Sequence, residues 1–138
     1  MASEALAVDV RAVRAVQGTV AVATLSAFVF HQLWVIPVLG VFVGAGAIMG
    51  PPGNPIYRIF DWLVAPRLSP VADVEPAATL RAQDVLAVAV LGTAMVCLLI
   101  GLGGLAWIVA LGEAGVAAVA ATTGVNLGVV IRDRLRRA

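Results

Sequence analysis

Long apolar runs alternate with short polar segments along this chain. An apolar helix of about 20 residues spans the ~30 Å hydrocarbon core of a bilayer, so each run has the length of a membrane helix. We therefore predict an all-α membrane protein, a single domain over residues 1–138, whose four transmembrane helices form two helical hairpins. The predicted spans cover residues 13–31, 33–50, 84–101 and 105–131.

The turn between the third and fourth spans decides where Glu113 lies. The 28 residues from Val85 to Gly112 contain no charge. As one helix they would extend ~42 Å, which exceeds the thickness of the bilayer core. We prefer a turn at the glycine-rich residues 101–104, which places Glu113 inside the fourth span. The competing turn, at residues 112–115, makes Glu113 a loop residue in water.

A short amphipathic helix is predicted between the second and third spans. Glycine and proline at residues 50–53 stop the second helix, Asn54 is a typical N-cap, and Pro55 suits the first helical position. The helix, residues 55–65, is too short to span and is expected at the cytoplasmic interface, where it can also cover the end of the bundle. An exposed linker, residues 66–83, follows. The predicted interfacial residues are Arg58, Trp62, Arg67 and Arg81.

Glycines recur at four-residue spacing in the second and fourth spans. This small-xxx-small spacing lets helix backbones approach closely in lipid, although glycine is also simply common in membrane helices. We interpret these glycines as helix-packing positions. They are Gly40, Gly44, Gly46, Gly50, Gly124 and Gly128.

The two halves of the chain resemble each other. When Gln17 is aligned with Gln83, a run of Ala, Val and Leu residues matches, and Trp34 and Trp107 each open the second helix of a half. The similarity favours a parallel repeat of two spans, although apolar helices also align by chance.

Composition and charge support a membrane location and one orientation. Hydrophobic residues make up 62% of the chain and charged residues 12%, against ~25% charged in soluble domains. The nine basic residues, all arginines, lie before the first span, between the second and third, and after the fourth. By the positive-inside rule, both termini and the linker are predicted to face the cytoplasm, in a multi-pass protein of the cell (inner) membrane. The net charge of +1 gives no electrostatic case for nucleic acid binding.

Two polar residues inside predicted spans are the candidate intramembrane sites. Glu113 would lie about 8 residues, or ~12 Å, into the fourth span, where a carboxylate is costly unless it is protonated, paired or hydrated. Asn126 lies further along the same span, where we favour an interhelical hydrogen bond over ligand binding. The sequence offers no nucleophile with its base, no metal-ligand set and no phosphate loop, so we predict no catalytic residue, metal or cofactor.

The middle of the chain carries a pattern that resembles a known family. The pattern consists of Gly50-Pro51, Asn54-Pro55, Pro66-Arg67-Leu68, Arg81 and Gln83, preceded by Val8-Asp9, Arg11 and Arg14. It resembles an uncharacterised bacterial membrane family, domain of unknown function 4395, over about residues 8–130. That family usually ends in a Gly-Phe-Cys-Leu-Gly-Cys-Glu type motif. Here Asn126 and Val129 stand at the positions of the cysteines and Val130 at that of the acid, so thiol chemistry of cysteine-bearing relatives is not expected.

Three functions compete on these observations. The leading hypothesis is a non-enzymatic structural or accessory subunit that packs against itself or a larger membrane complex. The alternative is a small transporter or channel with Glu113 as an intramembrane polar site. A membrane thiol oxidoreductase needs a pair of cysteines, and this chain has Cys97 alone.

Overall fold

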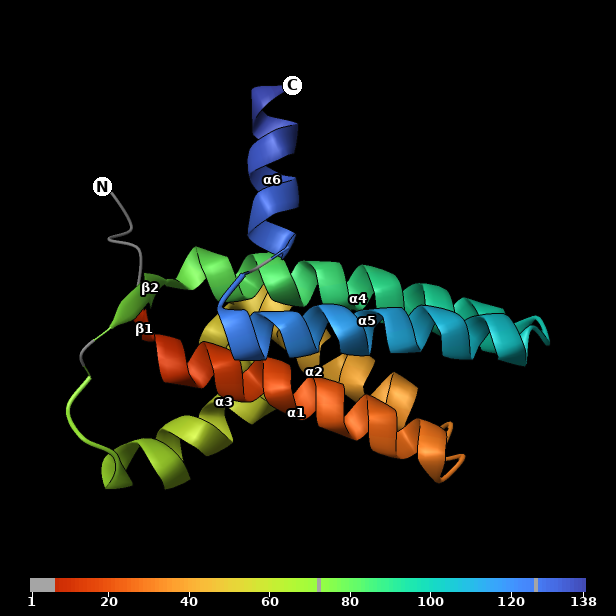
Figure 1. The fold of residues 1–138 in the computed structure, drawn as a ribbon, viewed down its shortest axis with the longest axis horizontal. Helices are drawn as coiled ribbons and strands as arrows, with labels where there is room; N and C mark the ends of the chain where they lie inside the picture. Colours follow the sequence, from red (N-terminus) through yellow and green to blue (C-terminus); the bar gives the residue numbers. More distant parts are fainter. Residues whose placement is uncertain (1–6, 72, 126) are drawn as a thin grey trace.

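Four long helices lie against one another and form the body of the molecule (Figure 1). The computed structural model describes residues 7–71, 73–125 and 127–138. The bundle consists of α1 (Val10–Val29), α2 (Val35–Met49), α4 (Ala77–Leu99) and α5 (Gly103–Thr123). The prediction of an all-α protein is confirmed, apart from one short strand pair.

Three of the bundle helices, α1, α4 and α5, are long and apolar enough to cross a membrane. Helix α2 is also apolar, but its 15 residues extend only ~22 Å. Many large apolar side chains on the outside of the bundle are exposed, among them Val29, Val41, Leu99 and Ile108. This surface suits lipid and supports an integral membrane protein.

The packing pairs helices from different halves of the chain. Helix α1 packs mainly on α5, and α2 mainly on α4, while α4 and α5 also contact each other closely. Helices α4 and α5 therefore form a packed pair, whereas α1 and α2 share only a small contact. Alanines along α5 explain this arrangement, because their small side chains let α1 and α4 approach at the same time. They are Ala106, Ala110, Ala114, Ala117 and Ala120, all buried.

The turn between α4 and α5 lies at the preferred site, residues 101–104, and not at residues 112–115. Helix α4 ends at Leu99 and α5 begins at Gly103, with Gly101 in the turn at φ +83°. Glu113 is therefore the eleventh residue of the 21-residue helix α5, halfway along it.

The third helix begins seven residues before the predicted span 84–101. Helix α4 begins at Ala77, so much of the predicted linker 66–83 is helical. The polar residues Gln83 and Asp84 and the apolar Leu80 are all buried in this first part of α4. Their side chains face the bundle, and their polarity in the sequence concealed the helix.

A short pair of strands ties the N-terminus to the chain before α4. Strand β1 (Ala7–Asp9) runs antiparallel to β2 (Val74–Pro76), with Val8 opposite Glu75. Val8 is buried in a small apolar cluster with Val13, Val16 and Leu80. The sequence did not predict these strands, because three residues are too few to show an alternating pattern.

The predicted fourth span, 105–131, is also wrong at its end. Helix α5 stops at Thr123, and Gly124 follows in the left-handed conformation, φ +76°, a common helix terminator. A separate helix, α6 (Leu127–Arg137), then runs across α4 and points away from the bundle (Figure 1).

The segment predicted as an interfacial helix, 55–65, is helical but irregular. A 3₁₀ turn (Pro51–Gly53) precedes α3 (Pro55–Ile59), which continues as a π-helical turn (Phe60–Val64) and a 3₁₀ turn (Ala65–Arg67). In Figure 1 this segment and the strands lie at one end of the bundle, opposite the α1–α2 and α4–α5 turns.

Candidate functional site

Among the described residues, six polar side chains are buried inside the bundle, and they form the candidate site. A polar group removed from water is costly unless it finds a partner, so each of them calls for an explanation. They come from α1, α4, α5 and the residue that caps α3. The six are Gln17, Thr24, Asn54, Gln83, Asp84 and Glu113; we call them the interior polar residues.

Asp84 and Asn54 form the best-defined part of this group. The Asn54 amide Nδ2 donates to Asp84 Oδ2 at 3.1 Å, while Asn54 Oδ1 accepts from the Ile56 backbone N–H at 3.0 Å and caps α3. Gly46 of α2 lies against both side chains, since a Cβ there would collide with the Asp84 carboxylate and come within 2.9 Å of Asn54 Cβ. The Asp84 carboxylate of α4 therefore contacts both Gly46 of α2 and Asn54, the residue that caps α3.

Gln83, beside Asp84, connects α4 to α6. Its Oε1 accepts from the Gly128 backbone N–H at 2.6 Å, a bond between buried groups 45 residues apart. The Gln83 Nε2 atom is buried without a hydrogen-bond partner among the described residues. This contact fixes the start of α6 on the bundle.

Glu113 lies deepest along the bundle. It is 2% exposed, and its Oε2 atom has no hydrogen-bond partner within the part of the chain that the structure describes. Its position halfway along α5 puts it ~15 Å from either end of that helix. The buried Ala110 and Ala117 lie one turn before and one turn after it on the same face of α5.

Thr24 of α1 lies at nearly the same height as Glu113. Helices α1 and α5 run antiparallel (Figure 1), and the rings of Phe28 and Trp107 meet near their ends at 5.4 Å between centroids. Thr24 is four residues from Phe28 and Glu113 six residues from Trp107, a difference in height of ~3 Å. The Thr24 hydroxyl is also buried without a hydrogen-bond partner among the described atoms.

The charges around these residues are unbalanced. Among residues 7–71, 73–125 and 127–138, the ion pairs are Arg11–Asp9 at 2.7 Å and Arg132–Asp133 at 3.2 Å, and both lie outside the interior. Asp84 and Glu113 are both buried, with 0% and 2% of their surface exposed. A buried carboxylate without a cation is strongly disfavoured, so a proton or another cation is expected to accompany this pair.

Asp9 shows the opposite situation at the start of α1. Its Oδ1 atom accepts from the Arg11 backbone N–H at 2.8 Å and caps the helix, and the Arg11 guanidinium binds the same carboxylate. The hydrogen bond from the Arg11 side chain lowers the pKa of Asp9 from its ordinary value. Asp9 is therefore a charged cap at neutral pH.

The glycines predicted in the second span have different roles. Gly46 makes the close contact with Asp84 described above, and Gly44 is in ordinary contact with Val88 of α4. At Gly40, no atom lies within 4 Å of the place that a Cβ would occupy, so this glycine makes no packing contact of this kind. Gly50 lies outside α2, at φ +81°, where it ends the helix.

Gly124 and Gly128 do not pack together on one span, because the helix predicted to contain both is broken between them. Gly124 terminates α5, and the guanidinium of Arg14 lies 3.0 Å from the position of its missing Cβ. Gly128, in α6, has the Ala82 backbone oxygen 2.6 Å from its own Cβ position. Gly128 therefore does allow a close approach of two helices, but the helix that approaches α6 here is α4.

The predicted interfacial residues are exposed. Trp62 is 77% exposed, and Arg58 and Arg67 lie on the same irregular helical segment. Arg81 donates from Nε to the Ala47 carbonyl at 2.8 Å, near the C-terminal end of α2, where a cation is favourable. Asn126 lies outside the described residues.

The described residues contain no group of three or more potential metal ligands. Cys97 is a buried free thiol on α4. Sequence reasoning identified Glu113 as a lone charge in an apolar run, but it interpreted Asp84 as a residue of the helix start. The Asn54–Pro55 cap was recognised in the sequence, but its consequence was not: the side-chain amide of a buried cap needs a partner, which here is Asp84.

Comparison with known proteins gives a family and no relative of known function. No curated protein matches the chain, and no solved structure matches it. A family model described as "Domain of unknown function (DUF4395)" matches residues 8–137, nearly the whole chain and all the interior polar residues. The chain therefore belongs to the DUF4395 family.

Proposed function

We propose that this protein is a non-enzymatic, proton-linked transporter of a small solute in the cell (inner) membrane, with Glu113 as its proton-binding group. The observation that carries the proposal is the position of Glu113, which is buried halfway along a membrane-length helix and whose Oε2 atom has no hydrogen-bond partner among the residues that the structure describes. Ionisable residues inside a membrane are costly, and they commonly mark ion or proton pathways.

The proposed topology has four spans, with both termini in the cytoplasm. Helix α2 lies along α4, and the turns on either side of it lie at opposite ends of the bundle (Figure 1). Although α2 is short, a local thinning of the bilayer or its flanking residues can make up the difference. All nine arginines belong to the end with the strands, α3 and α6, which by positive-inside bias is the cytoplasmic end.

The interior polar residues outline half of a proton path. Asp84 is fifteen residues from the outer end of α4, and Glu113 is ten from the adjoining end of α5, so Asp84 lies ~7 Å nearer the cytoplasm. Between Glu113 and the outer turn, α5 presents Ala106 and Ala110 to the interior. Such small side chains give the least resistance to a movement that opens this half.

A flux assay in proteoliposomes tests the proposal. Vesicles that contain a pH-sensitive dye are exposed in turn to small inorganic ions, organic acids, amines and amino acids. At least one solute is expected to change the internal pH, and Glu113→Gln is expected to remove that change because its amide cannot exchange a proton. Asp61→Asn, which removes an exposed acid outside the bundle, is the matched control.

Two results would contradict the transporter. One is the same solute-driven pH change in Glu113→Gln as in the wild type. The other is the absence of flux for every class of solute, in vesicles where circular dichroism shows the protein to be folded.

A second candidate is the accessory subunit, and the outer face of α5 favours it. Gly104, Gly112 and Gly115 lie on this helix, and within the described part of the chain no atom beyond their own helix backbone lies within 4 Å of the Cβ position of any of them. Glycines with open space around them let a partner helix approach closely in lipid. Native mass spectrometry of protein extracted from its own membranes tests this.

The accessory hypothesis predicts a bound partner or second copy, which Gly112→Leu releases and Gly40→Leu, on α2, does not. A monomer in mild detergent and in lipid nanodiscs alike would rule out this candidate.

A further inference from the structure

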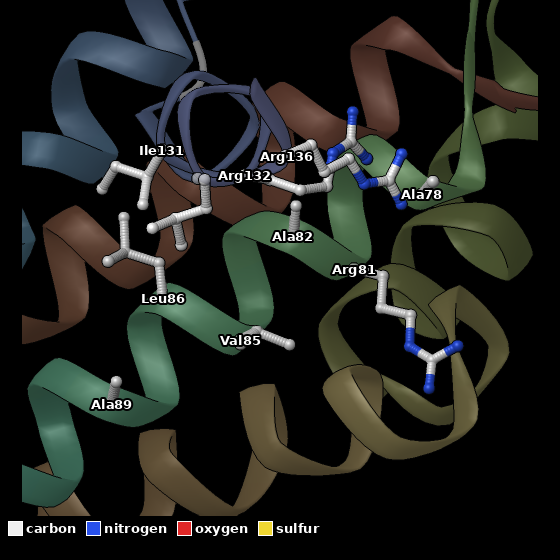
Figure 2. Close-up of a pocket in the computed structure, with 11 residues that line it drawn as sticks. Ala78, Arg81, Ala82, Val85, Leu86, Ala89, Ile131, Arg132 and Arg136 are labelled. Atoms are coloured by element: carbon white, nitrogen blue, oxygen red, sulfur yellow. The ribbon is translucent and has the colours of Figure 1, made fainter. Parts of the chain in front are cut away.

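A groove between α4 and α6 combines an apolar floor with a pair of arginines. Its volume is about 680 Å³, and α4 supplies the floor through Ala82, Val85, Leu86 and Ala89. Figure 2 shows α6 crossing above this floor, with Ile131 directed toward it.

The two arginines lie at one end of the groove. Arg132 and Arg136 are one turn apart on α6, and Figure 2 shows their guanidinium groups next to each other near Ala78, at the N-terminal end of α4. Arg132 is paired with Asp133 at 3.2 Å, and that bridge leaves donors on both guanidinium groups. Two adjacent cations repel each other, so a bridging anion stabilises them.

The third arginine of the lining, Arg81, is already engaged. Its side chain turns away from Arg132 and Arg136 (Figure 2) and donates to the Ala47 carbonyl at 2.8 Å. The charge of the groove is therefore concentrated in the pair on α6.

The groove also has a direction. From Ala78 to Ala89 the floor follows α4 for ~16 Å, from the arginine end toward the middle of the bundle. With the bundle across the bilayer, this direction leads from the interface into the hydrocarbon. An amphipathic ligand with a phosphate at one end and a chain at the other matches both ends.

We infer that this groove binds one anionic phospholipid, whose phosphate lies between Arg132 and Arg136 and whose acyl chain lies on the α4 floor. Basic pockets at the cytoplasmic surface of membrane proteins recognise such headgroups through charge-assisted hydrogen bonds. The rigid placement of α6, held by the bond from Gly128 to Gln83, shapes the site before the lipid arrives. The inference needs the chain to be in a membrane but does not rest on proton transport.

Native mass spectrometry with added lipid tests the site. The protein in mild detergent is titrated with phosphatidylglycerol and, separately, with phosphatidylcholine that has the same acyl chains. One phosphatidylglycerol is expected to bind in preference to phosphatidylcholine. Arg132→Gln/Arg136→Gln is expected to weaken this binding at least about tenfold, because two charged donors are lost.

The matched control is Arg134→Gln/Arg137→Gln, which removes the same charge from the same helix at residues outside the groove. It is expected to keep the wild-type affinity for phosphatidylglycerol. If both double variants bind phosphatidylglycerol equally weakly, the proposed site is wrong, and the lipid is attracted only by the overall positive charge of α6. Equal binding of phosphatidylcholine would overturn the anionic specificity.

Two further experiments distinguish a groove that binds the whole lipid from a site that binds only its anionic group. Ala89→Trp fills the floor without a change of charge and is expected to weaken phosphatidylglycerol binding, with an unchanged melting temperature as proof of folding. If Ala89→Trp binds the lipid as well as the wild type, or if inorganic phosphate alone competes fully with it, the acyl-chain site is wrong.

Discussion

Asp84 is held from two sides, by the Asn54 amide and by the backbone of Gly46. This is an unusual environment for an acid, because it offers one hydrogen-bond donor and no cation among the described groups. A protonated Asp84 can accept this bond and still donate its own proton, whereas a charged one would lack compensation. The arrangement therefore suits a carboxyl group that carries a proton for part of its cycle.

Gly46→Ala tests this close packing. The added methyl group would collide with the Asp84 carboxylate, so we expect the free energy of unfolding to fall by about 1–3 kcal/mol, as for overpacked cores. Thermal unfolding in detergent gives the measurement. Gly40→Ala, where nothing lies within 4 Å, is the control and is expected to be neutral or slightly stabilising. Equal stability of the two variants would show that Gly46 has room.

The candidate site could be predicted from the sequence only in part. A lone acid in an apolar run identified Glu113, and the spacing of glycines identified Gly46. Asp84 was missed because Arg81, Gln83 and Asp84 together look like a solvated helix start. Only the tertiary structure shows that Gln83 and Asp84 point inward while Arg81 reaches the end of α2.

At the scale of elements, α1 depends on its charged cap. The hydrogen bond from the Arg11 side chain lowers the pKa of Asp9 below its ordinary value of 3.8, so the cap stabilises the folded state above that pH. This contribution is lost as the pH falls below 3.8 and through the lowered pKa.

Asp9→Ala tests the cap. We expect it to cost about 1 kcal/mol of stability at neutral pH, a typical value for a helix cap. Unfolding measured from pH 7 downward should show the difference from the wild type shrinking as Asp9 becomes protonated. A difference that stays constant through the acid range would mean that the carboxylate does not stabilise α1.

Helix α6 depends on one close approach. A Cβ at Gly128 would come within 2.6 Å of the Ala82 backbone oxygen, and that backbone cannot easily move. Gly128→Ala is therefore expected to detach α6 from α4 and to speed hydrogen exchange over α6 by at least about tenfold, while the four-helix bundle stays protected. Gly92→Ala, at an open position on α4, should leave α6 protected. Unchanged exchange in Gly128→Ala would contradict this role.

The ends of elements were harder to predict than their existence. The apolar runs located all four bundle helices, but not the early start of α4 at Ala77 or the end of α5 at Thr123. The break at Gly124 was obscured because apolar residues continue beyond it. The alternation of arginines and apolar residues after Leu127 was the available sign of a separate amphipathic helix.

At the scale of the whole molecule, the helix pairing agrees with the similarity between the halves. Helix α1 packs on α5 as α4 packs on α2, so exchanging the halves converts one pair into the other. The contact between α4 and α5 has no equal counterpart between α1 and α2. The repeat stays a hypothesis, which the sequence could raise but not decide.

The proposed topology predicts which turns reach each side of the membrane. In a Cys97→Ala background, a cysteine at His31, in the α1–α2 turn, should react with an impermeant maleimide added outside intact spheroplasts. A cysteine at Ser69, in the segment before β2, should react only after the membrane is opened. The reverse pattern would mean that the molecule has the opposite orientation in the membrane. Labelling of both cysteines from outside would mean that α2 does not cross the membrane, so the number of spans would be odd.

Proton-linked transport requires Glu113 to carry a proton inside the bilayer, and infrared spectroscopy in hydrated lipid bilayers at neutral pH can detect that proton. We expect the carbonyl band of a protonated carboxylic acid in the wild type, which Glu113→Gln weakens or removes and Asp61→Asn leaves unchanged. A wild-type spectrum without this band, or a Glu113→Gln spectrum identical to that of the wild type, would show that Glu113 is not protonated.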